Sequence, residues 1–387
     1  MAAQTYRPAT NGAAVFTIRL AEGLARAGHR VLVLMPSDRV RPYRSMLNGV
    51  EVCTVTALPL RPLRADIYVT PRPGREVGPL LDAFRPDVVH VQDHYPLCRG
   101  VVRAAGARGL ALVGTSNFLP DNLLSQMPVP AGVRGLLERL LWRTVRAVFD
   151  RVDVVTAASE TSAAILRAQG LRPPVCAISS GVDLRRFRPD PGIDRAAVRR
   201  RYGLDPERVL FLFVSRLDPE KRVDLLLWAL HRLGRDDLQV AVAGRGTQLG
   251  AWRALAEALG LGERVVFTGF VPGRDLPALL ASADVFLMPG EAELQSIATL
   301  EAMACGRPVL AADARALPEL VESGVNGYLF RAGDPRDLAR AMARMMDERA
   351  RWPAMGAASA QKAAEHDLER TVSRYQALYQ EVCRAGI

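Results

Sequence analysis

Three glutamates in the stretch GEAELQSIATLEAMACG, residues 290–306, combine residue types and a spacing that suit ligand binding. The pattern predicts a loop up to Ser296 and then a helix, so Glu301 is expected about two turns beyond Glu293, bordering the same ligand. An ionised carboxylate only accepts hydrogen bonds, so this pair suits the hydroxyl groups of a sugar. For Glu291 we expect plain exposure to solvent.

The start of the predicted helix is a second candidate binding feature. The backbone N–H groups of Gln295, Ser296 and Ile297 lack partners within the helix and point out of its N-terminus. The partial positive charge at a helix N-terminus favours an anion, so these three amides predict a phosphate site.

Two cations follow a predicted strand in the segment FVSRLDPEKRVD. Arg216 and Lys221 lie in the loop after that strand, where both can converge on one anion. Lys221 is one of only two lysines in a chain that otherwise uses arginine, which indicates a need for a compact ammonium group. The alternative is that both cations pair with Asp218 and Glu220 on a solvated loop.

Short apolar runs alternate along the chain with helical stretches such as residues 13–28. This β-α-β alternation predicts parallel sheets covered by helices on both faces. The pattern restarts after residues 179–192, so we expect two doubly wound α/β domains and a cleft at the carboxyl ends of their strands, where such sheets bind ligands. The predicted strands are residues 30–36, 87–91, 111–116, 153–159, 209–215, 238–244, 264–269, 284–289 and 307–313.

Composition excludes several classes of protein. Of the 387 residues, 49% are apolar, and no block is low in complexity, which excludes a disordered chain. The chain shows neither a signal-peptide pattern nor a run of 18 apolar residues, so we expect an unexported protein without a membrane span. Five scattered cysteines without C-x-x-C spacing argue against disulfides and zinc, and favour the cytoplasm.

Charge is distributed unevenly between the two predicted domains. Residues 1–178 contain 22 arginines and 13 acidic residues, whereas residues 179–387 contain 29 lysines plus arginines and 28 acidic residues. The excess predicts that the N-terminal domain faces an anionic partner such as an acidic membrane surface, although codon bias also explains a high arginine total. Nucleic acid is not expected, because no binding module or interleaved aromatic pattern is present.

Residues 133–150, VRGLLERLLWRTVRAVFD, predict a basic amphipathic helix. Its apolar positions are 133, 137, 140, 141, 145 and 148, while Arg139, Arg143 and Arg146 lie on another face. Either the apolar face packs on the sheet, or the helix lies on a membrane surface. The charge excess of this half of the chain favours the second alternative.

Four separated motifs resemble those of the retaining nucleotide-sugar glycosyltransferases of family 4, which have the GT-B fold. In chain order they are TYRPATNGAAVFTIRLAEGLARAGHRVLVLMP, SSGVDLRRFRP, SRLDPEK and ELQSIATLEAMACGRPV, and the similarity extends from about residue 5 to residue 382. GTSNFLPDNLL, together with the glutamate stretch, is most similar to the bacterial branch that glycosylates membrane lipids, including diacylglycerol glucosyltransferases and phosphatidylinositol mannosyltransferases. The resemblance implies an acceptor domain at 1–178, a nucleotide-sugar domain at 179–364 and a helix at 365–387 that crosses back to the first domain.

The resemblance also implies roles for individual residues. Glu293 corresponds to the first glutamate of the E-x7-E motif, near the transferred sugar, and Glu301 to the second, which binds the ribose hydroxyls. Arg216 and Lys221 correspond to the cations on the donor diphosphate, and residues 295–297 to the helix terminus beside it. Transfer is then expected to retain the anomeric configuration by front-face attack. No metal or cofactor is expected, since these cations can stabilise the departing diphosphate.

Three positions in the N-terminal domain complete the comparison with the family. Gly12 matches the glycine that lets this domain approach the donor phosphate. Family members carry a histidine where GTSNFLP has Asn117, which can hydrogen-bond a sugar hydroxyl but carries no charge, and His94 is a possible substitute. A strand that normally precedes TYRP is apparently missing, because only MAAQ precedes Thr5. We expect unpaired backbone in the neighbouring strands, and either an upstream start or a truncated, marginally stable chain.

The leading interpretation is transfer of a hexose from a UDP-glucose or GDP-mannose type of donor to a membrane lipid. The protein would then be peripheral on the inner face of the plasma membrane. The alternatives are a soluble acceptor or growing glycan, and a catalytically weakened homologue that binds nucleotide sugar. The donor base, the sugar, the acceptor and the oligomeric state are not distinguished by the sequence.

Overall fold

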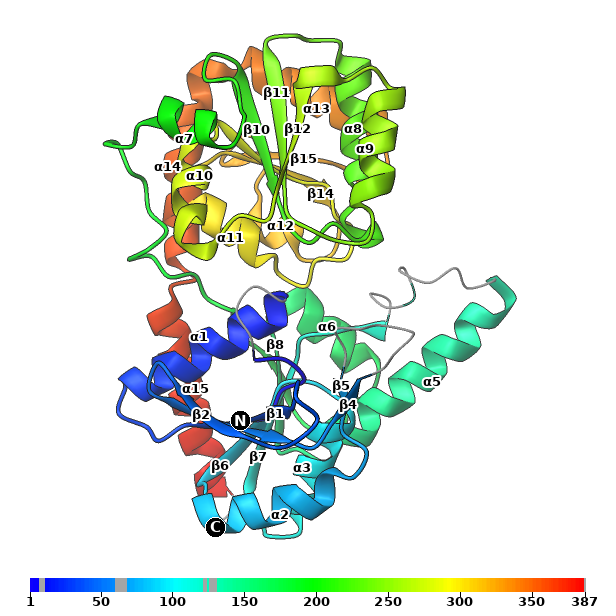
Figure 1. Ribbon diagram of the computed structural model, residues 1–387, viewed down its shortest axis with the longest axis vertical. Helices are drawn as coiled ribbons and strands as arrows, with labels where there is room; N and C mark the ends of the chain where they lie inside the picture. Colours follow the sequence, from blue (N-terminus) through cyan, green and yellow to red (C-terminus); the bar gives the residue numbers. More distant parts are fainter. Residues whose placement is uncertain (7–10, 60–67, 121–123, 125–130, 386–387) are drawn as a thin grey trace. The chain divides into compact units, whose positions relative to one another are not determined.

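The computed structural model describes residues 1–6, 11–59, 68–120, 124 and 131–385, and the chain forms two compact units (Figure 1). The first unit comprises Met1–Leu124, Val129–Ser180 and Leu368–Ile387, and Gly181–Asp367 makes up most of the second. Each unit has its own sheet with helices against it, as the alternating sequence pattern predicts; the pairings are parallel except that β2 (Arg44–Leu47) pairs antiparallel with β3 (Val50–Val55) at the edge of the first sheet.

The helices and strands of the first unit alternate along the chain. In order they are α1 (Gly12–Arg26), β1 (Leu32–Pro36), β2 (Arg44–Leu47), β3 (Val50–Val55), β4 (Leu58–Pro59), β5 (Tyr68–Val69), α2 (Pro73–Phe84), β6 (Val88–Val91), α3 (Pro96–Gly106), β7 (Ala111–Ser116), α5 (Ala131–Phe149), β8 (Val154–Ala157), α6 (Glu160–Ala168), β9 (Val175–Ala177) and α15 (Leu368–Ala385).

The first residues of the chain join two halves of this sheet, β2-β3-β1 and β6-β7-β8-β9. Ala2 forms parallel bridges to β1 and β6: its N–H donates to the carbonyl of His90 (2.8 Å), and its carbonyl accepts from Gln92 (2.9 Å). The N–H of Ala3 donates to the carbonyl of Leu34 (3.0 Å). In the described part of the chain no regular strand precedes α1, as expected. The expectation of unpaired backbone groups was wrong at these positions, because the first three residues suffice to bridge the gap between β1 and β6.

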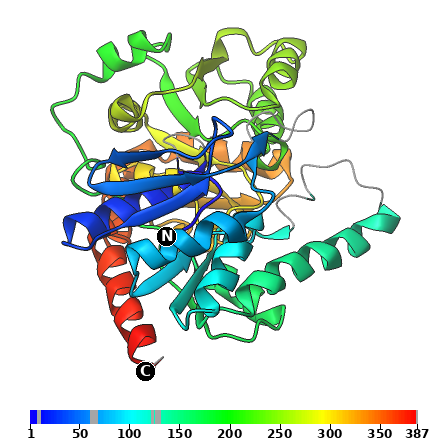
Figure 2. The same cartoon turned by 60° about the horizontal axis from the view of Figure 1, so that its bottom comes forward.

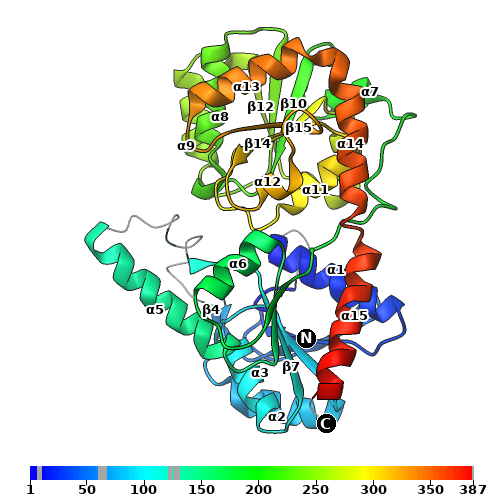
Figure 3. The same cartoon turned by 180° about the vertical axis from the view of Figure 1, so that it is seen from behind.

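Helix α15 completes the first unit by packing against α1 and β7 (Figure 3). The fully buried Tyr375 places its hydroxyl 3.0 Å from the hydroxyl of Thr156, and the hydroxyl of Tyr379 lies 2.7 Å from Nδ1 of His90. Burial lowers the pKa of His90 to about 3, so its ring is neutral. His90 is therefore a packing residue that ties the C-terminal helix to the sheet.

Helix α5 has two different halves, and its N-terminal half extends away from the sheet of its own unit (Figure 2). The C-terminal half buries Trp142, Val145, Val148 and Phe149. The N-terminal half exposes Val133, Leu136 and Leu140. Packing against the first unit thus accounts for the apolar residues in the C-terminal half of α5 but not for those in its N-terminal half.

The second unit continues the alternation. Its elements are α7 (Arg195–Arg201), β10 (Val209–Val214), η1 (Pro219–Lys221), α8 (Val223–Leu233), β11 (Leu238–Ala243), α9 (Leu249–Ala258), η2 (Gly262–Arg264), β12 (Val265–Gly269), η3 (Gly273–Asp275), α10 (Leu276–Ser282), β13 (Val285–Met288), α11 (Ile297–Ala304), β14 (Val309–Asp313), α12 (Leu317–Leu320), β15 (Gly327–Arg331), α13 (Pro335–Asp347), η4 (Arg349–Arg351) and α14 (Trp352–Ala364).

The sheet of the second unit has the order β12-β11-β10-β13-β14-β15, and its adjacent strands are all parallel. Every residue of β11 is buried. A strand covered on both faces explains why this segment is an uninterrupted apolar run rather than an alternating one. β10 and β13 lie at the centre of this sheet, within the large buried core of the unit.

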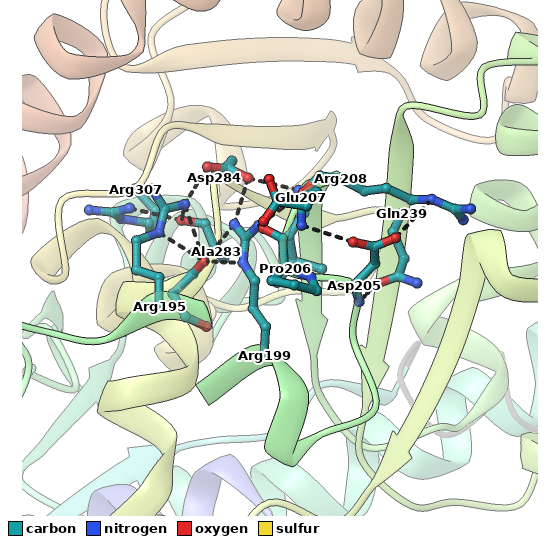
Figure 4. Close-up of polar contacts among 12 residues, drawn as sticks. Arg195, Arg199, Asp205, Pro206, Glu207, Arg208, Gln239, Ala283, Asp284 and Arg307 are labelled. Atoms are coloured by element: carbon teal, nitrogen blue, oxygen red, sulfur yellow. Dashed lines mark hydrogen bonds and ion pairs between the residues drawn. The ribbon is translucent and has the colours of Figure 1, made fainter. Parts of the chain in front are cut away.

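An arginine cluster fixes the amino ends of β10 and β13 (Figure 4). Asp284, just before β13, accepts from the backbone N–H of Leu210 in β10 (2.8 Å) and from Arg199 of α7 (2.8 Å), and it also pairs with Arg195. Arg307 donates to the carbonyl of Ala283 (2.8 Å). These bonds set the register of the two strands at the end opposite to the loops that carry the predicted site residues.

Candidate functional site

The strand order of the second unit creates a topological switch point between β10 and β13. Connections leave these two neighbouring strands toward opposite edges of the sheet, β11 on one side and β14 on the other. Ligands of doubly wound sheets bind at the carboxyl ends of the strands at such a point. The loops that follow β10 and β13 carry Arg216, Lys221 and Glu293, so the fold places the predicted donor residues there.

A lysine–glutamate pair spans the switch point. Nζ of Lys221 donates to Oε1 of Glu293 at 2.5 Å, and the side chains are only 15% and 10% exposed. Lys221 therefore does not pair with Asp218 or Glu220, the partners in the alternative interpretation. It joins two loops that are 72 residues apart in the chain.

Arg216, in contrast to Lys221, pairs with both carboxylates of the alternative interpretation, Asp218 and Glu220. Its guanidinium pairs with Asp218, and Nη2 donates to Oε1 of Glu220 at 3.0 Å. Glu220 is buried, and burial raises the pKa of its carboxyl. The arginine is 37% exposed, so it remains accessible to an anion although two carboxylates hold it in place.

A second ion pair corrects the prediction for Glu291. Arg222 has a left-handed backbone (φ 51°) between η1 and α8, and its guanidinium contacts both Glu291 and Asp224. Glu291 is thus an ion-paired, half-buried residue, and the expectation of plain solvent exposure was wrong. The turn at Arg222 brings together residues from both loops, which the sequence did not reveal.

The N-terminus of α11 has the predicted position, with Ile297 as its first residue. Ser296 precedes it with φ 70°, a conformation that costs a residue other than glycine about 1–3 kcal/mol and that occurs often at functional sites. Its hydroxyl lies 2.8 Å from the hydroxyl of Thr299. Gln295 and Glu301 are also buried, and Glu301 lies within α11 itself.

The sequence interpretation missed a third loop, GRGT at residues 244–247, which follows β11. A Cβ at Gly244 would lie 1.8 Å from the carbonyl oxygen of Ser215, so only glycine allows this loop to approach the loop after β10. The hydroxyl of Thr247 donates to Asp218 at 3.0 Å, which orients the carboxylate that holds Arg216. Two glycines directly after a buried strand were the available signal.

A small substitution at Gly290 tests the geometry around Glu293. An added Cβ would lie 3.2 Å from Oε1 of Glu293 and 3.7 Å from Cα of Lys221. Gly290→Ala should displace the carboxylate from its rotamer at a cost of about 0.5–1.5 kcal/mol, so the Kd for a nucleotide-sugar donor should rise roughly two- to tenfold. Isothermal titration measures this change. Gly250→Ala, where an added Cβ meets nothing within 4 Å, is the control, and an equal effect in both variants would contradict the expectation.

Three predicted residues belong to the first unit. His94 and Asn117 follow the neighbouring strands β6 and β7, and Nδ2 of Asn117 donates to the carbonyl of Gln92 at 3.1 Å. Gly12 is the exposed first residue of α1, which Asn11 caps by accepting from Ala14 (2.8 Å). Of the TYRPATNG motif, residues 7–10 lie outside the described residues. The roles of His94, Asn117 and Gly12 stay predictions.

The environment of His94 disfavours a charged role. Its ring stacks on Tyr95 with centroids 4.9 Å apart and lies 5.4 Å from the ring of Phe118. Burial lowers the pKa of His94, and the neighbouring Asp93 opposes this shift only in part. A neutral imidazole is therefore expected at pH 7, and it can exchange hydrogen bonds with a hydroxyl group.

No group of three or more His, Cys, Asp or Glu side chains in the described part of the chain is arranged to hold a metal ion. The charges on the loops at the switch point include Arg216, Lys221 and Arg222, together with their carboxylate partners. This combination can bind an anionic, hydroxyl-rich ligand, because cations bind phosphate and carboxylates accept from hydroxyls.

Comparisons with known proteins assign both halves of the chain to one group. Residues 10–186 match the model "Glycosyltransferase Family 4", and residues 194–363 match "Glycosyl transferases group 1". The fold matches the solved structure of a sucrose-phosphate synthase from Thermosynechococcus elongatus, with a TM-score of 0.79, 20% identity and 99% of each chain covered.

Three curated relatives are similar in sequence. A GDP-mannose-dependent alpha-mannosyltransferase of Mycolicibacterium smegmatis is 32% identical over 90% of this chain and 89% of its own length. A GDP-mannose-dependent alpha-(1-6)-phosphatidylinositol monomannoside mannosyltransferase of the same species is 36% identical, but the match covers 59% of this chain and only 62% of that protein. A D-inositol 3-phosphate glycosyltransferase of Catenulispora acidiphila is 30% identical over 97% and 92% of the two chains.

The two Rossmann-like sheets and these matches define the class of protein, a nucleotide-sugar-dependent glycosyltransferase of the GT-B fold. The chain belongs to glycosyltransferase family 4. It is a retaining hexosyltransferase, so the predicted fold class, family and type of enzyme are confirmed.

Proposed function

We propose that this enzyme transfers mannose from GDP-mannose to a hydroxyl of a phosphoinositide-type membrane lipid, with retention at the anomeric carbon. Support for the donor comes from two of the relatives, whose names specify GDP-mannose. Support for the acceptor comes from the relative that acts on a phosphatidylinositol mannoside. Of the predicted donors, GDP-mannose is therefore preferred to UDP-glucose.

The cluster at the switch point supplies the donor chemistry in this proposal. Arg216 and Lys221 bind the diphosphate, and the amides of residues 295–297 add hydrogen-bond donors at the start of α11. The same groups stabilise the negative charge that develops on the leaving GDP as the glycosidic bond breaks. Glu301 accepts from the ribose hydroxyls. Glu293 lies beside the mannose, and its ion pair with Lys221 holds the ammonium group at the switch point, where the diphosphate binds in this proposal.

The proposal of a lipid acceptor rests on one observation: the N-terminal half of α5 exposes apolar side chains. Val133, Leu136 and Leu140 expose 45%, 58% and 44% of their surface along one side of the helix. Three exposed arginines accompany them, and none of the three has an ion pair among the described residues: Arg134, Arg139 and Arg143. Apolar side chains flanked by free cations are the pattern of a helix that lies in an anionic membrane surface. In the part of the chain that is described, no helix is long and apolar enough to cross a bilayer.

A soluble inositol phosphate is the second candidate acceptor. The relative named D-inositol 3-phosphate glycosyltransferase matches over nearly the full length of both chains. Both acceptors present an inositol ring beside a phosphate. They differ in the diacylglycerol part, which only the lipid has.

Transfer assays distinguish these acceptors. Purified enzyme receives GDP-mannose or UDP-glucose together with phosphatidylinositol vesicles or soluble inositol 3-phosphate. We expect mannose transfer to the vesicles, and we expect the rate to fall as salt screens the attraction between the arginines of α5 and the membrane. Leu136→Gln/Leu140→Gln should lower the rate on vesicles and leave binding of GDP unchanged. Transfer to inositol 3-phosphate alone would contradict the lipid acceptor, and preference for UDP-glucose would contradict the donor.

A further inference from the structure

A cavity of about 910 Å³ lies within the first unit, between α2, α3 and α5. Its size is in the range of about 300–1,000 Å³ that is typical of small-molecule sites. Small residues line the α2 and α3 side, including Gly74, Gly78, Gly100 and Ala104. Tyr95, Phe118 and Leu141 supply larger apolar surface. The cavity is therefore suited to an elongated, mainly apolar group.

The apolar side of α5 leads directly into this cavity. Leu141 and Thr144 line it, and they lie one and two turns beyond Leu137 on the same side of the helix. The exposed stripe of Val133, Leu136 and Leu140 precedes them along the helix. A lipid acyl chain that leaves a membrane along this stripe thus contacts continuous apolar surface as far as Leu141.

Two arginines place free positive charge in the same cavity. Arg99 and Arg103 stand one turn apart on α3, both are exposed, and neither guanidinium group has an ion pair or hydrogen bond within the described part of the protein. The third arginine of the lining, Arg108, differs because it is neutralised by Asp82 at 2.7 Å. Two unpaired guanidinium groups one helical turn apart can bind one phosphate group through charge-assisted hydrogen bonds.

Two of the lining residues follow strands of the first unit, at the carboxyl ends where a ligand is expected to bind. His94, which follows β6, is one of the lining residues. Thr70 is another: it is buried, and its hydroxyl has no hydrogen-bond partner among the described residues. A buried hydroxyl without a partner is costly, and a ligand that supplies one would remove that cost.

We propose that this cavity binds the acceptor lipid, with the phosphodiester on Arg99 and Arg103 and an acyl segment along Tyr95, Phe118 and Leu141. Charge complementarity and the continuous apolar path from α5 both favour a phosphodiester lipid over a neutral one. The inference rests on the proposed lipid acceptor and deepens it, because it assigns the lipid to particular residues. His94 at the inner end then faces the headgroup that receives the sugar.

The test uses lipid binding without donor, so that it does not depend on transfer. Dioctanoyl phosphatidylinositol is titrated calorimetrically into the full chain, into Arg99→Gln/Arg103→Gln and into the control Arg26→Gln/Arg30→Gln, which removes two charges from exposed positions outside the cavity. We expect the first variant to bind the lipid at least about tenfold more weakly and the control to match the wild type. Leu141→Ala should weaken binding of the lipid but not of inositol 1-phosphate, the headgroup alone.

The outcomes separate this inference from the proposed function. If lipid transfer occurs but Arg99→Gln/Arg103→Gln binds dioctanoyl phosphatidylinositol as tightly as the wild type, the site assignment is wrong and the function stands. If the wild type binds inositol 1-phosphate or inorganic phosphate as tightly as the lipid, the occupant is a soluble phosphate and the lipid assignment is wrong. Arginine-dependent lipid binding without mannose transfer would support the site and contradict the function.

Discussion

Replacing Lys221 with alanine is expected to lower kcat/KM for the nucleotide-sugar donor by about tenfold to a hundredfold. The ammonium group lies at the switch point, 2.5 Å from Glu293, where the donor diphosphate is proposed to bind. A hydrogen bond between charged groups contributes roughly 1.5–3 kcal/mol, which corresponds to this range. The loss should be larger in the transition state, because charge on the diphosphate increases as the glycosidic bond breaks.

The chain offers its own control for this substitution. Lys362 is the other lysine, and it lies on α14 with a partly exposed side chain. Lys362→Ala should retain wild-type kinetics, whereas Lys221→Arg should recover part of the activity because it restores charge without the compact shape of an ammonium. Steady-state kinetics with GDP-mannose as varied substrate measures all three. Wild-type kcat/KM in Lys221→Ala would remove Lys221 from the donor site.

Replacing Asp284 with alanine is expected to cost about 3–5 kcal/mol in the free energy of unfolding. Arg199 is buried, and all its donors are used: they reach the carbonyls of Ser282, Pro206 and Arg208 at 2.8–3.0 Å and the carboxylate of Asp284 at 2.8 Å. Without Asp284 the buried guanidinium keeps its neutral partners but loses the carboxylate that compensates its charge. The loss is a large part of the roughly 5–15 kcal/mol by which domains are stable.

Urea unfolding followed by tryptophan fluorescence measures this effect, because Trp228, Trp252 and Trp352 lie in the second unit. Asp284→Asn keeps the acceptor for Leu210 and should be less destabilising than alanine. The control is Asp236→Ala, since the Asp236 side chain is 92% exposed and its ion pair with Arg264 is 3.9 Å long; a surface change of this kind costs within about 0.5 kcal/mol. Equal midpoints for Asp284→Ala and the control would contradict a stabilising role of the cluster.

The central architecture could be predicted from the sequence because burial on both faces leaves a local signature. Uninterrupted apolar runs such as residues 238–244 indicate parallel strands, and β11 lies at Leu238–Ala243. β3 (Val50–Val55) and β15 (Gly327–Arg331) escaped the prediction, since VEVCTV and GYLFR contain charged residues that interrupt the pattern. The N-terminus of α11 was predictable because the turn signals at both ends of that helix are local.

Pairings between loops were less predictable, since the strand order that brings them together is not a local property. Lys221 and Glu293 meet because β10 and β13 are neighbours in the sheet, although the two residues are 72 positions apart in the chain and β11 and β12 lie between them in sequence. The same adjacency pairs Arg222 with Glu291, which the sequence interpretation placed in solvent. The amphipathic pattern of α5 was visible, but the pattern alone does not tell which half finds a partner within the unit.

Because this chain has only two lysines, binding of the donor diphosphate at the switch point can be observed directly at Lys221. Reductive methylation with 13C-formaldehyde labels only Lys221, Lys362 and the α-amino group, and Lys221→Arg assigns the signals. We expect the Lys221 dimethylamino resonance to shift saturably as GDP is added, while the Lys362 resonance does not move. A Lys221 resonance that stays fixed at GDP concentrations that fully inhibit transfer would show that the diphosphate binds elsewhere.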